Sequence, residues 1–435
     1  MLVQPSKRFA IVAVATLLAI PALWGQAPQK NWKDRGEYDL YDSITKEAGA
    51  AKKLELLNAW KEKYPATDFK QERLQLYLTT YQALNQPAKM VETAQEMLAN
   101  DPKDLQALYW IAFLTPSLGK NTEDVLQPGE KAASGLLSNL DTFFAPEKKP
   151  PQATEADWKK ARTDMEAAAQ KTLGWIAMQR KNNEDAAKAF RSSLDLNPNA
   201  GEVSYWLGTV LLGTRKAENI SPALYHFARA ASFEGQGALV PQGRHEVGKY
   251  LEKVYTNFHG DRSGLDELLA RAKVNAIPPD DFKIESSYEI AARKEEELKK
   301  TNPMLALWMS VKKELTGPNG EAYFESNVKG AGLPGGAEGI QKFKGKLISH
   351  KPPRNPKELV IGIADPNTPE VTLVLDEPLT GRAEAGTEIA FEGVASAFTR
   401  EPFMVTFDVE KAQLQGWPAP APAAKKAPKK AVKKK

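Results

Sequence analysis

Apolar residues recur at helical spacing from about Asp34 to Ala276, and short polar breaks separate one run from the next. This spacing predicts a series of amphipathic helices, each with one apolar stripe. A single pair of such helices cannot bury its stripe alone. We therefore expect residues 34–276 to form helical pairs that stack on one another.

Two segments of this helical region match each other at a spacing of 34 residues. The first helix of each segment carries Leu-Gly, at Leu173-Gly174 and Leu207-Gly208. The second helix carries Ala, a phenyl ring and a small residue: Ala186, Phe190 and Ser193 and, after a three-residue insertion in the turn, Ala223, Phe227 and Ala230. A glycine lets two helices approach closely, and a facing ring fills the space beside it. Pro198 closes the first unit, because proline ends a helix.

These residues resemble the tetratricopeptide repeat, whose helical hairpins recur every 34 residues or so. Tyr77, Leu78, Ala94 and Pro102 follow the same pattern less closely. A last pair near residues 241–276 lacks the pattern and is expected to be a cap. The resemblance implies an α solenoid of about six hairpins over residues 34–276.

The apolar period changes along the second half of the chain. Residues 278–334 read as a helical connector with a glycine-rich end, and residues 340–414 alternate with a period of two. The alternation predicts five short strands, centred on Gly345, Ile361, Leu373, Phe391 and Val405. The later part also resembles the OB-fold at six positions: Leu379, Gly381, Gly386, Ile389, Phe391 and Gly393. The expected fold class is an α solenoid followed by a small all-β barrel.

The first residues have the layout of a secretory signal peptide. Lys7 and Arg8 precede an apolar stretch from Phe9 to Leu23, and small residues follow at Gly25 and Ala27. We expect residues 1–27 to direct export, with cleavage after Gly25 or Ala27; an uncleaved membrane anchor is the alternative. The expected location is the periplasm or cell envelope of a bacterium, or the exterior after secretion.

The positive charge of the chain is concentrated in its last residues. Residues 417–435 are rich in Pro, Ala and Lys, which predicts an extended tail without a core. The tail holds seven lysines: Lys425, Lys426, Lys429, Lys430, Lys433, Lys434 and Lys435. Subtracting these from the formal net charge of +4 leaves about −3 for the rest. The lysines could contact an anionic envelope polymer or lipid head groups, or simply keep the chain soluble.

We find no motif that would make the chain an enzyme. The absence of cysteine excludes disulfides, thiolate metal sites and a cysteine nucleophile. His245-Glu246 begins a zincin motif, but Lys249 occupies the position of the second histidine. The glycines at 330–335 match a dinucleotide fingerprint, yet they follow a helical segment instead of a strand. His226 is expected to pack or lie at the surface. We therefore expect no catalytic residue, no metal ion and no cofactor.

The concave face of the solenoid is the candidate site. In the repeat family the first helix of each hairpin lines that face, which implies ten groove residues here: Gln75, Thr79, Gln82, Tyr109, Phe113, Lys171, Trp175, Gln179, Tyr205 and Thr209. Rings and amides suit an extended peptide. The alternative is that Tyr109, Phe113 and Trp175 belong to the core between hairpins, since rings at helical spacing usually pack.

The favoured hypothesis is a non-catalytic scaffold that binds a protein or peptide of unknown identity. A second hypothesis is binding of nucleic acid or another polyanion through the OB-like domain and the lysine tail. Lys342, Lys344 and Lys346 share one strand face, but a solvated outer face explains them more simply. Export argues against a nucleic-acid partner. A third hypothesis, an enzyme without a local motif, has no positive support in the sequence.

Overall fold

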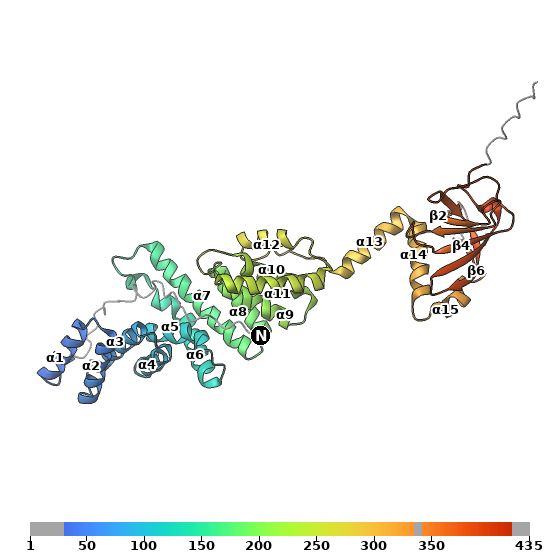
Figure 1. Cartoon of the computed structure of the whole chain (residues 1–435). Helices are drawn as coiled ribbons and strands as arrows, with labels where there is room; N and C mark the ends of the chain where they lie inside the picture. The colour runs from blue at the N-terminus through green and yellow to red at the C-terminus, as the bar shows by residue number, and fades with distance from the viewer. Residues whose placement is uncertain (1–29, 335–341, 420–435) are drawn as a thin grey trace, which may run out of the picture. The chain divides into compact units, whose positions relative to one another are not determined.

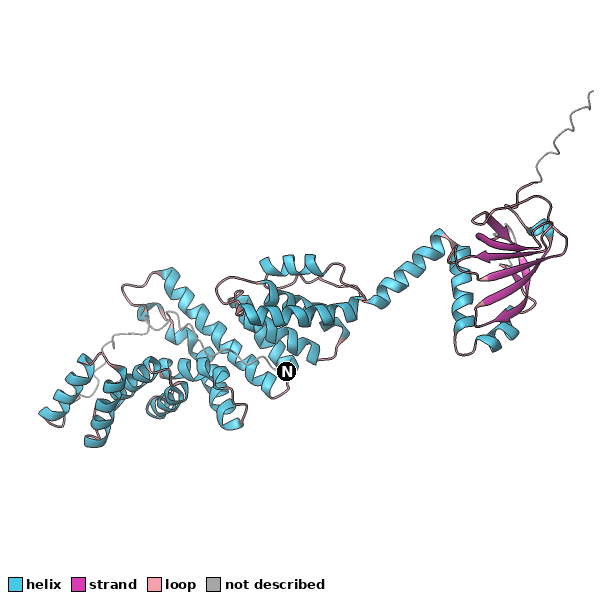
Figure 2. Cartoon of the chain, viewed as in Figure 1, coloured by secondary structure: helices cyan, strands magenta, loops and turns pink. Residues whose placement is uncertain are grey.

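A computed structural model describes residues 30–334 and 342–419, which divide into two compact units at Ser286 and Ser287. In the described residues the first unit is helical, and all strands lie in the second unit (Figures 1 and 2). The predictions for the signal peptide and for the lysines from Lys425 to Lys435 fall outside the described residues. Each unit is taken by itself below.

Residues 30–286 contain twelve α-helices, which follow one another as six pairs. The helices are α1 (Arg35–Lys46), α2 (Ala50–Lys63), α3 (Lys70–Ala83), α4 (Pro87–Asn100), α5 (Leu105–Leu114), α6 (Glu123–Phe143), α7 (Glu155–Gln179), α8 (Asn183–Leu196), α9 (Gly201–Gly213), α10 (Ile220–Ser232), α11 (Pro241–His259) and α12 (Leu265–Val274). From α1 to α11 each helix packs on the next, α5 also contacts α7, α7 contacts α9, and α12 packs on α10. Contacts between alternate helices are those of a stack of hairpins, so the expected helical solenoid is confirmed.

The predicted small-against-large contacts are present in both matching hairpins. A Cβ atom added to Gly174 on α7 would lie 2.5 Å from the Phe190 ring on α8, and one added to Gly208 would lie 3.0 Å from Phe227 on α10. Both rings are buried. The three-residue insertion of the second hairpin forms a 3₁₀ turn at Ala217–Asn219, so it leaves the contact intact.

The second unit begins with α13 (Ser287–Thr301), α14 (Pro303–Thr316) and α15 (Gly320–Tyr323). Within residues 287–334 and 342–419 its seven strands are β1 (Gly332–Leu333), β2 (Phe343–Lys351), β3 (Glu358–Gly362), β4 (Val371–Leu375), β5 (Glu388–Phe391), β6 (Gly393–Thr399) and β7 (Met404–Val409). They form one sheet in the order β1-β6-β7-β4-β3-β2-β5, in which only β4 and β7 pair in parallel.

The sheet is curled by one short segment. Only Glu392 separates β5, which pairs with β2, from β6, which pairs with β7. Residues 388–399 therefore join strands near opposite ends of the sheet. The prediction of five strands was wrong because this segment breaks into two strands at Glu392 and because the glycine-rich stretch adds β1.

Helix α14 belongs to the core of the second unit, so the prediction that residues 278–334 form a separate connector was wrong for this helix. Trp308 is fully buried and packs against Phe343, Phe403 and Phe407. The apolar stripe of α14 faces the inside of the sheet. A helical pattern in the sequence predicts such a stripe but not the surface that it covers. The chain also stays ordered past the predicted start of the tail, because Trp417 packs against His350.

A buried carboxylate fastens α14 to the strands. Glu370, which is 1% exposed, accepts hydrogen bonds from the Trp308 indole at 3.1 Å and from the backbone N–H groups of Ile363 and Ala364 at 2.9 and 2.6 Å. The Lys312 ammonium on α14 pairs with the same carboxylate. Four donors compensate the desolvation of this charge, which makes removal of any partner costly.

We predict that Gly174→Ala destabilises the helical unit by about 1–3 kcal/mol, because the new methyl group overlaps the Phe190 ring. Gly248→Ala on α11 is the matched control. Its added Cβ would meet only Ala231 at 3.9 Å, so the better helix propensity of alanine should raise stability by about 0.5–1 kcal/mol. Urea unfolding of the whole chain, followed by far-ultraviolet circular dichroism, measures both changes. Equal effects of the two substitutions would contradict the packing argument.

We predict that Glu370→Gln destabilises the second unit by about 3 kcal/mol, because the amide removes the negative charge that pairs with Lys312 and turns its NH2 group toward either that ammonium or the buried N–H donors. Glu377→Gln is the control, since Glu377 pairs with Lys411 at the exposed surface and should change stability by less than about 1 kcal/mol. Hydrogen exchange of the β2, β3 and β4 amides reports on this unit alone. Unchanged exchange in Glu370→Gln would rule out the fastening role of the carboxylate.

Candidate functional site

A groove of about 680 Å³ runs across the helical unit between α5, α7 and the start of α9. Its volume lies within the usual range of ligand pockets. One wall is formed by Tyr109 and Phe113 of α5, and α7 forms the floor. The opposite wall combines the α8–α9 turn with the loop before α11, at Gln236 and Gly237. The groove is therefore built from segments far apart in sequence that the stacking of hairpins brings together.

The α5 wall is aromatic because this helix is apolar on almost every side. Asp104 caps its N-terminus by accepting a hydrogen bond from the Ala107 backbone N–H at 2.9 Å. One turn later the rings of Tyr109 and Phe113 stack at 5.6 Å with an angle of 15° between their planes. Tyr109 is 8% exposed and Phe113 is 37% exposed. The inner ring is thus held by the core, and the outer ring presents apolar surface to the groove.

The Tyr109 hydroxyl makes no hydrogen bond with any residue that the structure describes. Burial, with a smaller effect of the Asp164 charge on α7, raises the pKa of Tyr109 to about 12. The phenol therefore stays protonated at any physiological pH. Among the described residues it is a donor without an acceptor at the edge of the groove.

The floor on α7 combines three small residues, Ala161, Ala167 and Ala168, with the larger Met165. The charged groups beside them are paired: Lys160 with Asp164, and Lys171 with Glu202 of α9 at 2.7 Å. The Lys171 ammonium also lies 5.2 Å from the centre of the Trp206 ring. These ion pairs leave little uncompensated charge in the groove.

The far wall depends on a close contact between two loops. The backbone N–H of Gly201 donates to the Gly237 carbonyl at 2.9 Å, and Gly237 has a positive φ of 87°. A Cβ at Gly237 would lie 2.3 Å from the Asn199 carbonyl oxygen, so only glycine fits. This contact places the amide side chains of Asn197, Asn199 and Gln236 along one side of the groove.

The structure gathers three of the ten predicted groove residues around this cavity: Tyr109, Phe113 and Lys171. Trp175, at 7% exposure, lies in the core between hairpins. Six do not line the cavity, although all are at least partly exposed: Gln75, Thr79, Gln82, Gln179, Tyr205 and Thr209. The prediction did not include Asp164, Asn197 or Gln236. Two of these lie in turns between helices, where helical periodicity carries no signal.

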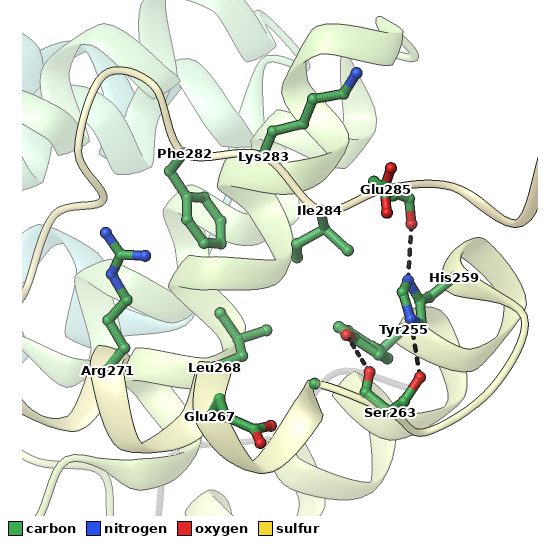
Figure 3. A pocket seen from close by; sticks show the side chains of 11 residues that line it. Tyr255, His259, Ser263, Glu267, Leu268, Arg271, Phe282, Lys283, Ile284 and Glu285 are labelled. Atoms are coloured by element: carbon green, nitrogen blue, oxygen red, sulfur yellow. Dashed lines mark hydrogen bonds between the residues drawn. The ribbon is translucent and has the colours of Figure 1, made fainter. Parts of the chain in front are cut away.

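A second cavity, of about 370 Å³, lies beside α11 and α12 (Figure 3). His259 Nδ1 lies 2.8 Å from the Glu285 carbonyl oxygen, and Nε2 lies 3.2 Å from the Ser263 hydroxyl. The Tyr255 hydroxyl donates to the Ser263 carbonyl at 2.6 Å. Ser263 in turn bonds to Asp261 through its hydroxyl and its backbone N–H. These hydrogen bonds join the end of the first unit, at Glu285, to the turn between α11 and α12. We therefore interpret the cluster as a contact that stabilises the fold.

Two of the three lysines at the start of β2, Lys342 and Lys346, have partners within the second unit. The Lys342 ammonium donates to the Gln413 carbonyl at 2.7 Å, and Lys346 pairs with Glu388 at 3.3 Å. In residues 30–334 and 342–419 no group of three or more His, Cys, Asp or Glu side chains is placed to hold a metal ion. No helix in the same ranges has the length and apolar character needed to cross a membrane.

No protein-family model matches the chain, and a search of curated proteins gives no match. Among solved structures, the assembly chaperone of RpL4, Acl4 (residues 1–338), is similar to 61% of this chain and to 98% of its own length. The two share 14% sequence identity and superpose with a TM-score of 0.37. A likeness at this level supports no functional argument, so the groove is interpreted from its own geometry.

His226 on α10 is buried, and its Nδ1 atom has no hydrogen-bond partner among the described residues. Burial, with a smaller effect of the Arg191 charge, lowers the pKa of His226 to about 3. The histidine is therefore neutral in the folded protein, whereas in the unfolded chain it takes up a proton below about pH 6.5.

We predict that the folded state loses about 2 kcal/mol through His226 between pH 7 and pH 5, because only the unfolded chain binds the proton there. His226→Leu should remove this part of the pH dependence. His245→Gln, at an exposed position on α11, should leave it unchanged. Urea unfolding curves at the two pH values measure the difference. Parallel losses in the wild-type protein and His226→Leu would show that another group is responsible.

Proposed function

We propose that this protein is a non-catalytic scaffold that binds a peptide segment of a partner protein in the groove between α5, α7 and α9. The observation that carries the proposal is the combination of a preformed cavity, a partly exposed ring at Phe113 and an unpaired hydroxyl at Tyr109. Protein interfaces take most of their affinity from a few such ring contacts that exclude water. The groove supplies this kind of surface through the rings of Tyr109 and Phe113.

We further propose that the helical unit is a tetratricopeptide solenoid. The support is the recurrence of Leu-Gly after 34 residues, with each glycine facing a buried phenyl ring of the following helix. For the second unit we propose an OB-like barrel. The support is an antiparallel β2-β3-β4 meander, the parallel β4–β7 pair and the bent segment β5–β6 that runs between β2 and β7.

We place this scaffold in the bacterial cell envelope. The support is the sequence alone: a positive start at Lys7 and Arg8, an apolar stretch and small residues at Gly25 and Ala27. An exported scaffold has access to envelope proteins, whose extended segments are candidates for the groove. Contacts of the lysines from Lys425 to Lys435 with anionic polymers or lipid head groups remain a prediction from composition.

A photoreactive phenylalanine at Phe113, introduced into the whole chain in its native cells, tests the proposal. We expect discrete crosslinked products at this position, and we expect Ala168→Trp to abolish them by filling the floor of the groove. The same photoreactive residue at Val274 is the control, because Val274 is 78% exposed and lies outside the groove. Products that form equally from both positions, or that persist with Ala168→Trp, would refute binding in the groove.

A further inference from the structure

We infer that the groove takes an extended, nearly uncharged peptide with one bulky apolar side chain, and that a backbone carbonyl of this peptide accepts a hydrogen bond from Tyr109. This inference rests on the proposed function and adds the chemistry of the partner. Three properties of the cavity support it: an apolar hollow, an unused donor, and charges that are already paired.

The hollow provides room for a single large apolar side chain. Phe113 exposes about a third of its surface, and Ala161 and Ala168 line the same cavity with small side chains. A leucine, methionine or aromatic side chain placed between the Phe113 ring and these alanines would be enclosed on both sides. Burying such a side chain is the main source of affinity for a peptide in a groove.

The Tyr109 hydroxyl is a donor that an acceptor of the partner can use. Its pKa of about 12 keeps the proton on the oxygen, and no described residue accepts that proton. A backbone carbonyl suits this role, because it is an uncharged acceptor that is available at every residue of an extended peptide.

The opposite wall supplies further partners for a peptide backbone. The Asn197 side-chain oxygen accepts from the Asn199 backbone N–H at 3.2 Å, and its amide nitrogen has no partner among the described residues. Gln236 is exposed and likewise makes no hydrogen bond within the described part of the chain. An extended segment between the two walls can therefore be hydrogen-bonded on both sides.

The charges of the groove offer little to a charged partner. Lys160 is paired with Asp164, and Lys171 with Glu202, so the five charged residues of the lining leave only Asp157 without an ion pair. The Asp157 carboxylate accepts a hydrogen bond from the Thr154 hydroxyl at 2.7 Å, in the first turn of α7, where the helix dipole favours it. A strongly acidic or basic peptide would lose the hydration of its charges on binding. It would find few unpaired charges in the groove to compensate for that loss.

A display library of random ten-residue peptides, selected on the whole chain, tests this inference. We expect the enriched peptides to share one large apolar residue and to carry little net charge. Their affinity should change less than about twofold between about 50 and about 500 mM NaCl, because exposed charges contribute little. Tyr109→Phe should weaken binding about tenfold through loss of one hydrogen bond, and Phe113→Ala should weaken it at least tenfold.

Tyr250→Phe is the matched control for Tyr109→Phe, because Tyr250 is an exposed tyrosine of the same unit outside the groove. Enrichment of acidic or basic peptides, or an affinity that falls steeply with salt, would overturn the inferred chemistry. An unchanged affinity of Tyr109→Phe would overturn the role of the hydroxyl. If no peptide is enriched while the Phe113 crosslinks persist, the inference fails and the proposed function stands; if the crosslinks are also absent, both fail.

Discussion

The approach of two helices to van der Waals contact at a glycine determines the geometry of the helical unit. Gly174 leaves no room for a methyl group beside Phe190, and Gly208 makes a similarly tight contact with Phe227, so each ring limits how far apart the two helices of its hairpin can lie. With that distance set, α5, α7 and α9 come to lie next to one another. The groove exists because these three helices are neighbours.

The groove forms where the helical unit departs from its own regularity. Helix α7 has 25 residues, whereas its partner α8 has 14, so the first half of α7 extends beyond the hairpin. Alanines on this extension meet the apolar helix α5 on one side and the turn at Asn197 on the other. A perfectly regular stack would have buried that face against a neighbouring helix. The irregular hairpin leaves it open to a ligand.

The spacing of apolar residues and the size of side chains predicted much of the architecture, because both determine structure among residues that are close in the sequence. The Leu-Gly pairs and their facing rings indicated the hairpins, and alternation indicated the strands. The depth of a side chain depends on what covers it, which is why Trp175 is buried while Phe113, at a similar helical phase, is partly open. For the same reason the sequence pattern placed Trp308 in a connector. The surface against which its helix packs became clear only once the sheet was known. Gln236 lies in a loop, where no regular spacing of apolar residues predicts which side chains face the groove.

The carboxylate of Glu370 has a consequence for how the second unit could be inherited. By gathering the Trp308 indole, the Lys312 ammonium and two backbone amides, it makes α14 part of the core of the curled sheet. A gene segment that encoded only the strands would leave the apolar interior of the sheet without α14 and would leave Glu370 without its Trp308 and Lys312 partners. A gene segment that transfers this unit with an intact core must therefore begin before Pro303 instead of at the first long strand.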